Sequence, residues 1–180
     1  MSKTRIEIIL GPMFAGKSSE LIRRTSRYKS IGKNVLLINH SYDIRTDNNV
    51  QTHSKYKERA IKVSSLMDLL DKDIFKHADV IGIDEAQFFN DLYNFILLAE
   101  KYNKIIIVSG LDGDYKRQPI GQILNLIPLC DNVIKLNAYD MIDKDGSPGI
   151  FTKRIIDSDK QIVIGAEKEH IAVSRKNFLL

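Results

Sequence analysis

The sequence predicts an α/β fold in which helices cover both faces of a parallel sheet of about five or six strands. Short apolar runs alternate with longer amphipathic segments along most of the chain, which is the order expected when crossover helices join parallel strands. The first apolar run leads directly into a glycine-rich turn. A change of composition after residue 138 indicates that a small lobe follows this sheet.

Five apolar runs are expected to form the buried strands. Each run is short and rich in isoleucine, leucine and valine, which suits strands that are covered on both faces. They span residues 6–10, 35–38, 80–83, 105–108 and 133–136.

Two helices are expected between these strands. Over residues 88–102 apolar side chains recur at helical spacing, so one face of that segment should pack on the sheet. The residues on that face are Phe88, Leu92, Phe95, Ile96, Ala99 and Tyr102. Ser65 and Asp68 precede another apolar stretch and resemble the capping box that begins a helix.

Two segments depart from this alternation. Residues 39–62 are polar and rich in turn formers, so they are expected to form a long surface excursion of the kind that often closes over ligands. Strand-like runs at 150–154 and 161–164 lie beyond the change of composition. We therefore divide the chain into a main domain over 1–138 and a small lobe over 139–180.

Composition limits the functional classes. The net charge of +4 comes from scattered residues in a chain of 180, so neither a nucleic-acid partner nor a membrane surface is indicated. Cys130 is the only cysteine, which excludes an intramolecular disulfide and a thiolate zinc cluster. No apolar stretch reaches the roughly 18 residues of a membrane span, and no signal region is evident. The expectation is a cytoplasmic enzyme.

The strongest motif is the segment GPMFAGKS, which directly follows the first predicted strand. It fits the phosphate-loop pattern G-x-x-x-x-G-K-[ST], in which backbone N–H groups and the following helix attract phosphate oxygens. Lys17 is expected to reach the β and γ phosphates, and Ser18 to bind Mg²⁺. The predicted ATP-binding residues are Gly11, Pro12, Met13, Phe14, Ala15, Gly16, Lys17 and Ser18.

An acidic pair follows the third predicted strand. Asp84 is expected to anchor Mg²⁺ together with Ser18, and Glu85 to accept a proton from an attacking hydroxyl or from water. Both motifs predict the use of a nucleoside triphosphate. They do not choose between hydrolysis and transfer to an acceptor, because both reactions use the same phosphate cradle.

Longer blocks of sequence narrow this choice. GPMFAGKS with the following SELIRR, then VIGIDEAQFF, LDGDYKRQPIGQILNLIPL and FTKR, resemble successive blocks of the type II thymidine kinase family of cellular and poxviral proteins. The resemblance implies a RecA-like P-loop NTPase fold with a C-terminal lobe called the lasso. It also implies transfer of the γ-phosphate of ATP to thymidine to give dTMP and ADP, a homotetramer, and feedback inhibition by dTTP.

The same resemblance assigns roles to single residues. Glu85 matches the general base for the nucleoside 5′-hydroxyl, Lys17 the phosphate-loop lysine, and Arg45 of the D-x-R element a cation that stabilises the transferring phosphoryl group. Phe88 matches the aromatic residue that packs on thymine. The positions that match substrate-binding residues are Met13, Asp43, Gln87, Phe88, Leu111, Tyr115, Phe151, Thr152, Ile162, Val163, Ile164, Gly165 and His170.

The chain departs from the family pattern in its lobe. Family members usually hold zinc there with two C-x-x-C pairs, but this sequence has Asp140, Asp143, Ser174 and Asn177 at those positions. Oxygen ligands of this kind bind zinc far less well than thiolates do. Zinc is therefore expected to be absent, or to be replaced by polar contacts. His170 stands where the family has a tyrosine that contacts substrate.

Other interpretations stay open at this point. Phe88 and Tyr115 also suit packing in the core, and Arg45 suits a solvated loop. The letters DEAQ resemble a helicase motif, so an ATPase is an alternative, although 180 residues leave no room for a second motor domain. A catalytically impaired nucleotide-binding protein is a third possibility.

Overall fold

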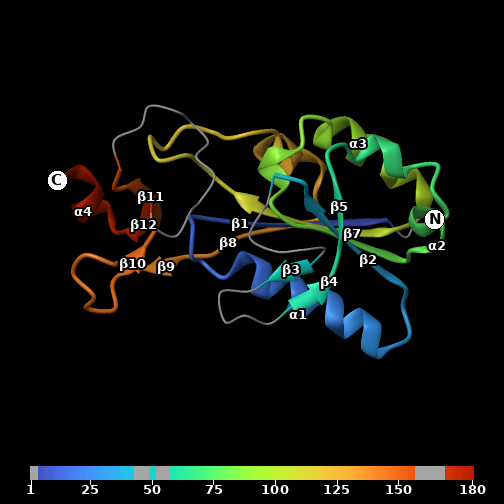
Figure 1. The fold of residues 1–180 in the computed structure, drawn as a ribbon, viewed down its shortest axis with the longest axis horizontal. Coiled ribbons are helices and arrows are strands. Elements are labelled where there is room, and N and C mark those ends of the chain that lie inside the picture. The colour runs from blue at the N-terminus through green and yellow to red at the C-terminus, as the bar shows by residue number, and fades with distance from the viewer. Residues whose placement is uncertain (1–3, 43–48, 52–56, 157–168) are drawn as a thin grey trace.

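The computed structural model describes residues 4–42, 49–51, 57–156 and 169–180 (Figure 1). Its centre is a six-stranded sheet in the order β5-β2-β6-β7-β1-β8, and every pair of neighbouring strands is parallel. The strands are β1 (Arg5–Gly11), β2 (Val35–His40), β5 (Ile61–Val63), β6 (Val80–Ile83), β7 (Ile105–Leu111) and β8 (Asn132–Lys135). The predicted parallel α/β sheet is confirmed, and each of the five apolar runs lies in a strand or overlaps one.

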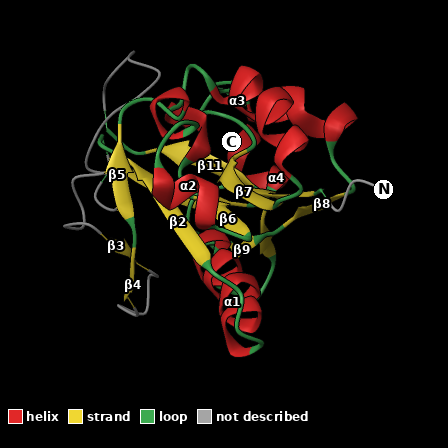
Figure 2. Cartoon of the chain, turned by 90° about the vertical axis from the view of Figure 1, so that its right-hand side faces the viewer, coloured by secondary structure: helices red, strands yellow, loops and turns green. Residues whose placement is uncertain are grey.

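Helices cover both faces of this sheet (Figure 2). On one face, Leu21 and Ile22 of α1 pack with Ile9 and Ile107 of the sheet. The opposite face carries the larger cluster, in which Phe75 and other apolar side chains from α2 and α3 meet the sheet. The helices are α1 (Lys17–Ser30), α2 (Asp73–His77) and α3 (Leu92–Ala99), with 3-10 turns η1 (Met67–Leu69), η2 (Ala86–Phe88), η3 (Glu100–Tyr102) and η4 (Ile123–Leu129).

The predicted helix over 88–102 is shorter and broken. Phe88 ends the turn η2, and α3 begins only at Leu92. The backbone N–H of Tyr93 bonds to the Gln122 side chain at 2.9 Å, so a distant residue helps to fix where α3 begins. Its expected apolar face is nevertheless present, because Leu92, Phe95, Ile96 and Ala99 are fully buried.

The predicted capping box at Ser65 is wrong. The Ser65 hydroxyl donates to Asp91 Oδ2 at 2.7 Å, and the same oxygen accepts the backbone N–H of Met67 at 3.0 Å. Asp91 therefore supplies from another part of the chain the acceptor that a local cap would provide. The segment forms only the short turn η1 rather than a long helix.

The interpretation of 39–62 as a surface excursion is partly wrong. Asn39 and His40 are buried at the end of β2, and Val50 and Ala60 are buried against the face that α1 covers. The segment contains the antiparallel pair β3 (Asn49–Gln51) and β4 (Lys57–Arg59). It also runs into β5, which pairs with β2 as the edge strand of the sheet.

The last part of the chain forms two small antiparallel pairs outside the main sheet. They are β9 (Ala138–Tyr139) with β10 (Pro148–Gly149) and β11 (Phe151–Arg154) with β12 (His170–Val173), followed by α4 (Arg175–Leu179). We call residues 139–156 and 169–180 the C-terminal lobe. The predicted strand at 161–164 lies outside the described residues, and the division into domains at residue 138 stays a prediction.

Among the described residues, no helix is long and apolar enough to cross a membrane.

Candidate active site

The phosphate loop joins the end of β1 to the start of α1. Gly11 adopts φ 153°, and a Cβ atom there would lie 2.5 Å from the Leu136 carbonyl oxygen, so only glycine fits. Gly16 precedes α1 in the left-handed region at φ 78°. The Lys17 ammonium donates to the Pro12 carbonyl at 2.7 Å, which places this charge across the loop. The loop thus places the N-terminus of α1, which attracts anions, next to the positive charge of Lys17.

The Asp84 carboxylate lies at the carboxyl end of β6 and is buried. It accepts a hydrogen bond from the Ser109 hydroxyl of β7 at 2.9 Å and another from the side chain of Ser18. Burial, and then the charge of Glu85, raise the pKa of Asp84 to about 6, against the lowering effect of the two serines. A divalent cation would relieve this cost of burying the carboxylate. The oxygen donors of Ser18 and Asp84 are of the kind that Mg²⁺ prefers.

Glu85 is half-buried and follows Asp84 in the left-handed region, at φ 49°. That conformation is uncommon for a residue with a side chain and is found at functional sites. The Gln87 side-chain nitrogen donates to Glu85 Oε2 at 2.6 Å. Gln87 Oε1 in turn accepts the backbone N–H of Leu111 at 3.0 Å. The Glu85 carboxylate is therefore held on a side chain that is itself fixed to the end of β7.

Two glycines make room for Gln87. A Cβ atom on Gly110 would lie 2.7 Å from Gln87 Oε1, and one on Gly121, where φ is 62°, would lie 2.2 Å from the Gln87 carbonyl oxygen. Gln87 itself is only 3% exposed. Its position is thus fixed by close packing as well as by hydrogen bonds, and it holds Glu85 at the sheet edge.

The predicted base-binding residues come from the turn η2, from the end of β7 and from the loop that follows β7. Phe88 ends the turn η2, Leu111 ends β7, and Tyr115 follows four residues later; all three are half-buried. From the C-terminal lobe, the Thr152 hydroxyl accepts the backbone N–H of Met13 at 3.0 Å. This hydrogen bond brings the lobe into contact with the phosphate loop.

Arg154 is a part of this region that sequence reasoning missed. Its guanidinium lies 3.7 Å from the centroid of the Tyr115 ring, and its Nε donates to His170 Nε2 at 3.1 Å. Arg154 therefore connects two residues that the sequence had assigned to the substrate. Arg154 is the last residue of the FTKR block, and this position in a block that resembles the family is the sequence feature that could have identified it. Phe151, also in this block, packs on Phe178 with ring centroids 5.1 Å apart.

A carboxylate forms the centre of the C-terminal lobe. Asp140 is 1% exposed. Its Oδ1 accepts the backbone N–H groups of Ile142 at 2.7 Å and Asp143 at 3.0 Å. Its Oδ2 accepts the backbone N–H of Ser174 at 2.5 Å and the Asn177 side-chain amide at 3.0 Å. We call these contacts the Asp140 cluster; they join the turn after β9 to the start of α4.

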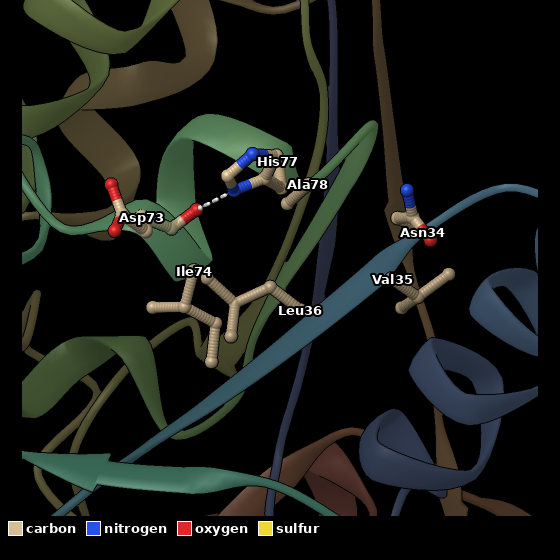
Figure 3. Close-up of a pocket in the computed structure, with 7 residues that line it drawn as sticks. All are labelled: Asn34, Val35, Leu36, Asp73, Ile74, His77 and Ala78. Atoms are coloured by element: carbon tan, nitrogen blue, oxygen red, sulfur yellow. Dashed lines mark hydrogen bonds between the residues drawn. The ribbon is translucent and has the colours of Figure 1, made fainter.

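Two cavities accompany these features. One, of about 120 Å³, lies beside the site and is lined partly by Asp112, Lys135, Phe151 and Thr152. The other, of about 300 Å³, is formed by the beginning of β2 and by α2 (Figure 3). Because β1 and β2 belong to one parallel sheet, the start of β2 lies at the amino ends of the strands, and the phosphate loop lies at their carboxyl ends. The smaller cavity is the one that adjoins the candidate chemistry.

A family model described as thymidine kinase matches residues 4–178. The chain belongs to the thymidine kinase family. The thymidine kinase of Yaba monkey tumor virus (strain VR587) is 45% identical over 170 residues, covering 94% of this chain and 92% of the relative. That of myxoma virus (strain Uriarra) is 41% identical over 173 residues, covering 96% and 94%. That of vaccinia virus (strain Western Reserve) is 38% identical over 179 residues, covering 99% of each.

Membership of the thymidine kinase family confirms the predicted resemblance and makes the chain a kinase. A solved structure supports the fold independently. The flagellar accessory protein FlaH from Methanocaldococcus jannaschii superposes with a TM-score of 0.51 at 16% identity, covering 87% of this chain and 74% of that one. Identity this low supports only a common RecA-like architecture.

The structure brings most of the predicted site residues to the end of the sheet where the carboxyl ends of its strands lie. Residues 11–18, Asp84, Glu85, Gln87 and Phe88 all follow the carboxyl ends of parallel strands, where ligands of such sheets usually bind. Other predicted residues lie outside the described part of the chain. They are Asp43, Arg45, Ile162, Val163, Ile164 and Gly165.

The zinc that the thymidine kinase family implies does not fit the Asp140 cluster. The carboxylate oxygens there accept four N–H donors, so backbone and amide hydrogens occupy the space that a cation would need. None of the four positions carries a thiolate. Within the described residues, no group of three or more histidine, cysteine or acidic side chains is placed to hold a metal.

Proposed function

We propose that this chain transfers the γ-phosphate of ATP to the 5′-hydroxyl of thymidine, giving dTMP and ADP. One observation carries the proposal beyond membership of the family. Glu85 is held by Gln87 beside the buried Asp84, at the sheet edge that also carries the phosphate loop. A carboxylate in this position suits a proton acceptor for a hydroxyl that attacks the terminal phosphate.

On the donor side, the phosphate loop from Gly11 to Ser18 would bind the ATP phosphates through backbone N–H groups and the start of α1. The Lys17 ammonium would exchange the Pro12 carbonyl for phosphate oxygens. Ser18 and Asp84 would hold Mg²⁺, which when bound neutralises charge on the phosphates. We also assign to Arg45 the role of stabilising the transferring group.

On the acceptor side, Glu85 would accept the proton of the 5′-hydroxyl. Gln87 keeps this carboxylate directed to one place, which lowers the entropy lost on reaching the transition state. Phe88, Leu111 and Tyr115, with Met13 and the lobe, would surround the thymine ring. Aromatic rings favour a flat base through stacking.

Several expectations of the family stay predictions. They are a homotetramer, feedback inhibition by dTTP, a cytoplasmic location and a C-terminal lobe without zinc. The Asp140 cluster supports the last of these, because its hydrogen bonds connect the segments that a metal would otherwise connect. Elemental analysis of the purified protein tests it, and one zinc per chain would contradict it.

Purified protein incubated with ATP labelled at the γ-phosphate and a panel of nucleosides tests the proposed function. We expect label on thymidine and none on ribonucleosides. Release of labelled phosphate without a nucleoside would instead support an ATPase, and ATP binding with no turnover would support an impaired nucleotide-binding protein.

Ser109→Ala is expected to raise the Mg²⁺ concentration needed for half-maximal activity by about tenfold. The Ser109 hydroxyl donates to Asp84 Oδ1, and groups that orient a metal ligand typically contribute this much to metal affinity. Titrating activity with Mg²⁺ at saturating thymidine measures the effect. The matched control is Ser30→Ala, because the Ser30 hydroxyl donates at 2.8 Å to the Arg27 carbonyl within the end of α1. An unchanged Mg²⁺ requirement in Ser109→Ala would contradict the assignment.

A further inference from the structure

His40 lies at the end of β2, next to the strand that carries Asp84. It is 4% exposed, and Nδ1 of its ring accepts the backbone N–H of Tyr42 at 3.0 Å. A ring nitrogen that accepts a hydrogen bond must be unprotonated. This contact therefore requires the neutral ring and fixes the direction of the chain where it leaves the sheet.

The same ring is the centre of an aromatic group that reaches the acceptor side of the site. Its centroid lies 4.6 Å from that of Phe89, in an edge-on arrangement, and 5.8 Å from that of Phe88. The Tyr42 ring packs on His40 at 4.7 Å and meets the Phe88 ring edge-on at 6.4 Å. Phe88 is thus contacted by both rings, while Phe89 is fully buried beneath them.

The surroundings of His40 favour its neutral form. Burial lowers the pKa of the ring, while a hydrogen bond with the Ser64 backbone and the charge of Asp91 oppose the shift. Asp91 is the charged group that acts on the ring among the described residues, and the Tyr42 phenol is the other titratable group packed against it. Because the folded protein resists protonation, it loses stability relative to the unfolded chain as the pH falls below about 6.5.

We propose that His40 is a positioning residue for the acceptor site. Its neutral ring holds Phe88 and the Tyr42 backbone in place, and protonation of the ring releases both. The proposal rests on the proposed function in one respect, that Phe88 packs on the thymine. Protonation would turn Nδ1 from an acceptor into a donor facing the Tyr42 N–H. The two donors would repel, and the ring would have to leave its place between Tyr42 and Phe89.

Two variants separate the parts of this role. His40→Phe keeps a buried ring but removes the acceptor and the titration. His40→Asn keeps an acceptor two residues before the Tyr42 N–H, as in an Asx turn, but removes the ring. We expect both to raise the thymidine KM by about three- to tenfold at pH 8, while the KM for ATP stays within about twofold.

The pH profile is the decisive measurement. Below the pKa of His40 the wild-type thymidine KM should rise by up to about tenfold for each pH unit, and in His40→Phe this rise should be absent. Taking the ratio of the two proteins cancels the titration of Asp84, which both proteins retain. His77→Asn is the control, because His77 is exposed and its Nδ1 lies 2.8 Å from the Asp73 carbonyl on α2 (Figure 3). Parallel profiles for wild type and His40→Phe would overturn the proposal.

A second measurement does not depend on catalysis. In a titration followed by nuclear magnetic resonance, the Tyr42 amide and the Phe88 ring signals should shift with the same midpoint as the His40 ring. If thymidine is not a substrate but these signals shift together, the proposed function fails and the positioning contact stands. If they do not follow His40, the positioning role fails even in an active kinase.

Discussion

Glu85→Gln is expected to lower kcat for thymidine phosphorylation by about 10²–10⁴-fold, the usual contribution of a general base. The amide matches the carboxylate in shape, and its oxygen can still accept the hydrogen bond from Gln87 that Glu85 Oε2 now accepts. It cannot take up a proton at neutral pH. Rapid-quench measurement of dTMP formation at saturating substrates isolates this step.

ATP binding should survive the same substitution. The charge of Glu85 is one of the causes that raise the pKa of Asp84, so its removal favours ionised Asp84 and does not weaken the proposed Mg²⁺ site. Calorimetric titration with a non-hydrolysable ATP analogue should give a Kd within about threefold of wild type. The matched control is Glu100→Gln, in the turn before β7 at the other edge of the sheet. Unchanged turnover in Glu85→Gln would remove Glu85 from its proposed role.

The central sheet was predictable because its signal is local. Runs such as 80–83 and 105–108 contain almost only apolar residues, and both became central strands. The edge strand β5 was missed because its sequence, Ile61-Lys62-Val63, is short and half-buried and follows a polar stretch. An edge strand has only one paired neighbour, so its sequence is less constrained to be apolar.

The same distinction applies to the site. The phosphate loop and the pair Asp84-Glu85 each lie within one short segment, so their pattern can be read directly. Ser109 and Arg154 act through partners that lie 25 and 16 residues away. Contacts of this kind depend on strand register and on packing of the lobe, which the sequence of either partner alone does not determine.

Asp140→Asn is expected to lower the melting temperature by about 5–10 °C and to raise the thymidine KM. The substitution replaces one acceptor oxygen with an NH₂ group that faces N–H donors, either those of Ser174 and Asn177 or those of Ile142 and Asp143. Buried donors that lose their acceptor destabilise the fold. The thymidine KM should rise as the lobe is destabilised, because Thr152, whose hydroxyl accepts the backbone N–H of Met13 in the phosphate loop, belongs to the same lobe.

Protonation of Asp140 at low pH should destabilise the wild-type protein, as the substitution Asp140→Asn does. Although burial alone would raise it, hydrogen bonds from Ser174, Asp143 and Asn177 hold the pKa of Asp140 well below its usual value of 3.8. A carboxyl group whose pKa is lower in the folded than in the unfolded chain stabilises the fold fully at a pH above its unfolded-state pKa. This stabilisation is lost as the pH falls through the folded-state pKa. The wild-type protein should therefore lose more stability than Asp140→Asn does between pH 4 and about pH 2.

Asp145→Asn is the control for both measurements. Asp145 is an exposed residue of the same lobe, and its carboxylate accepts the local backbone N–H of Ser147 at 2.9 Å and a hydrogen bond from the Ser147 side chain. If Asp145→Asn and Asp140→Asn lowered the melting temperature equally, the Asp140 cluster would not be what holds the lobe together. If instead added zinc raised the melting temperature of the wild-type protein and left that of Asp140→Asn unchanged, these positions would bind a metal after all. A hydrogen-bonded carboxylate predicts neither result, because its donors have no affinity for a cation.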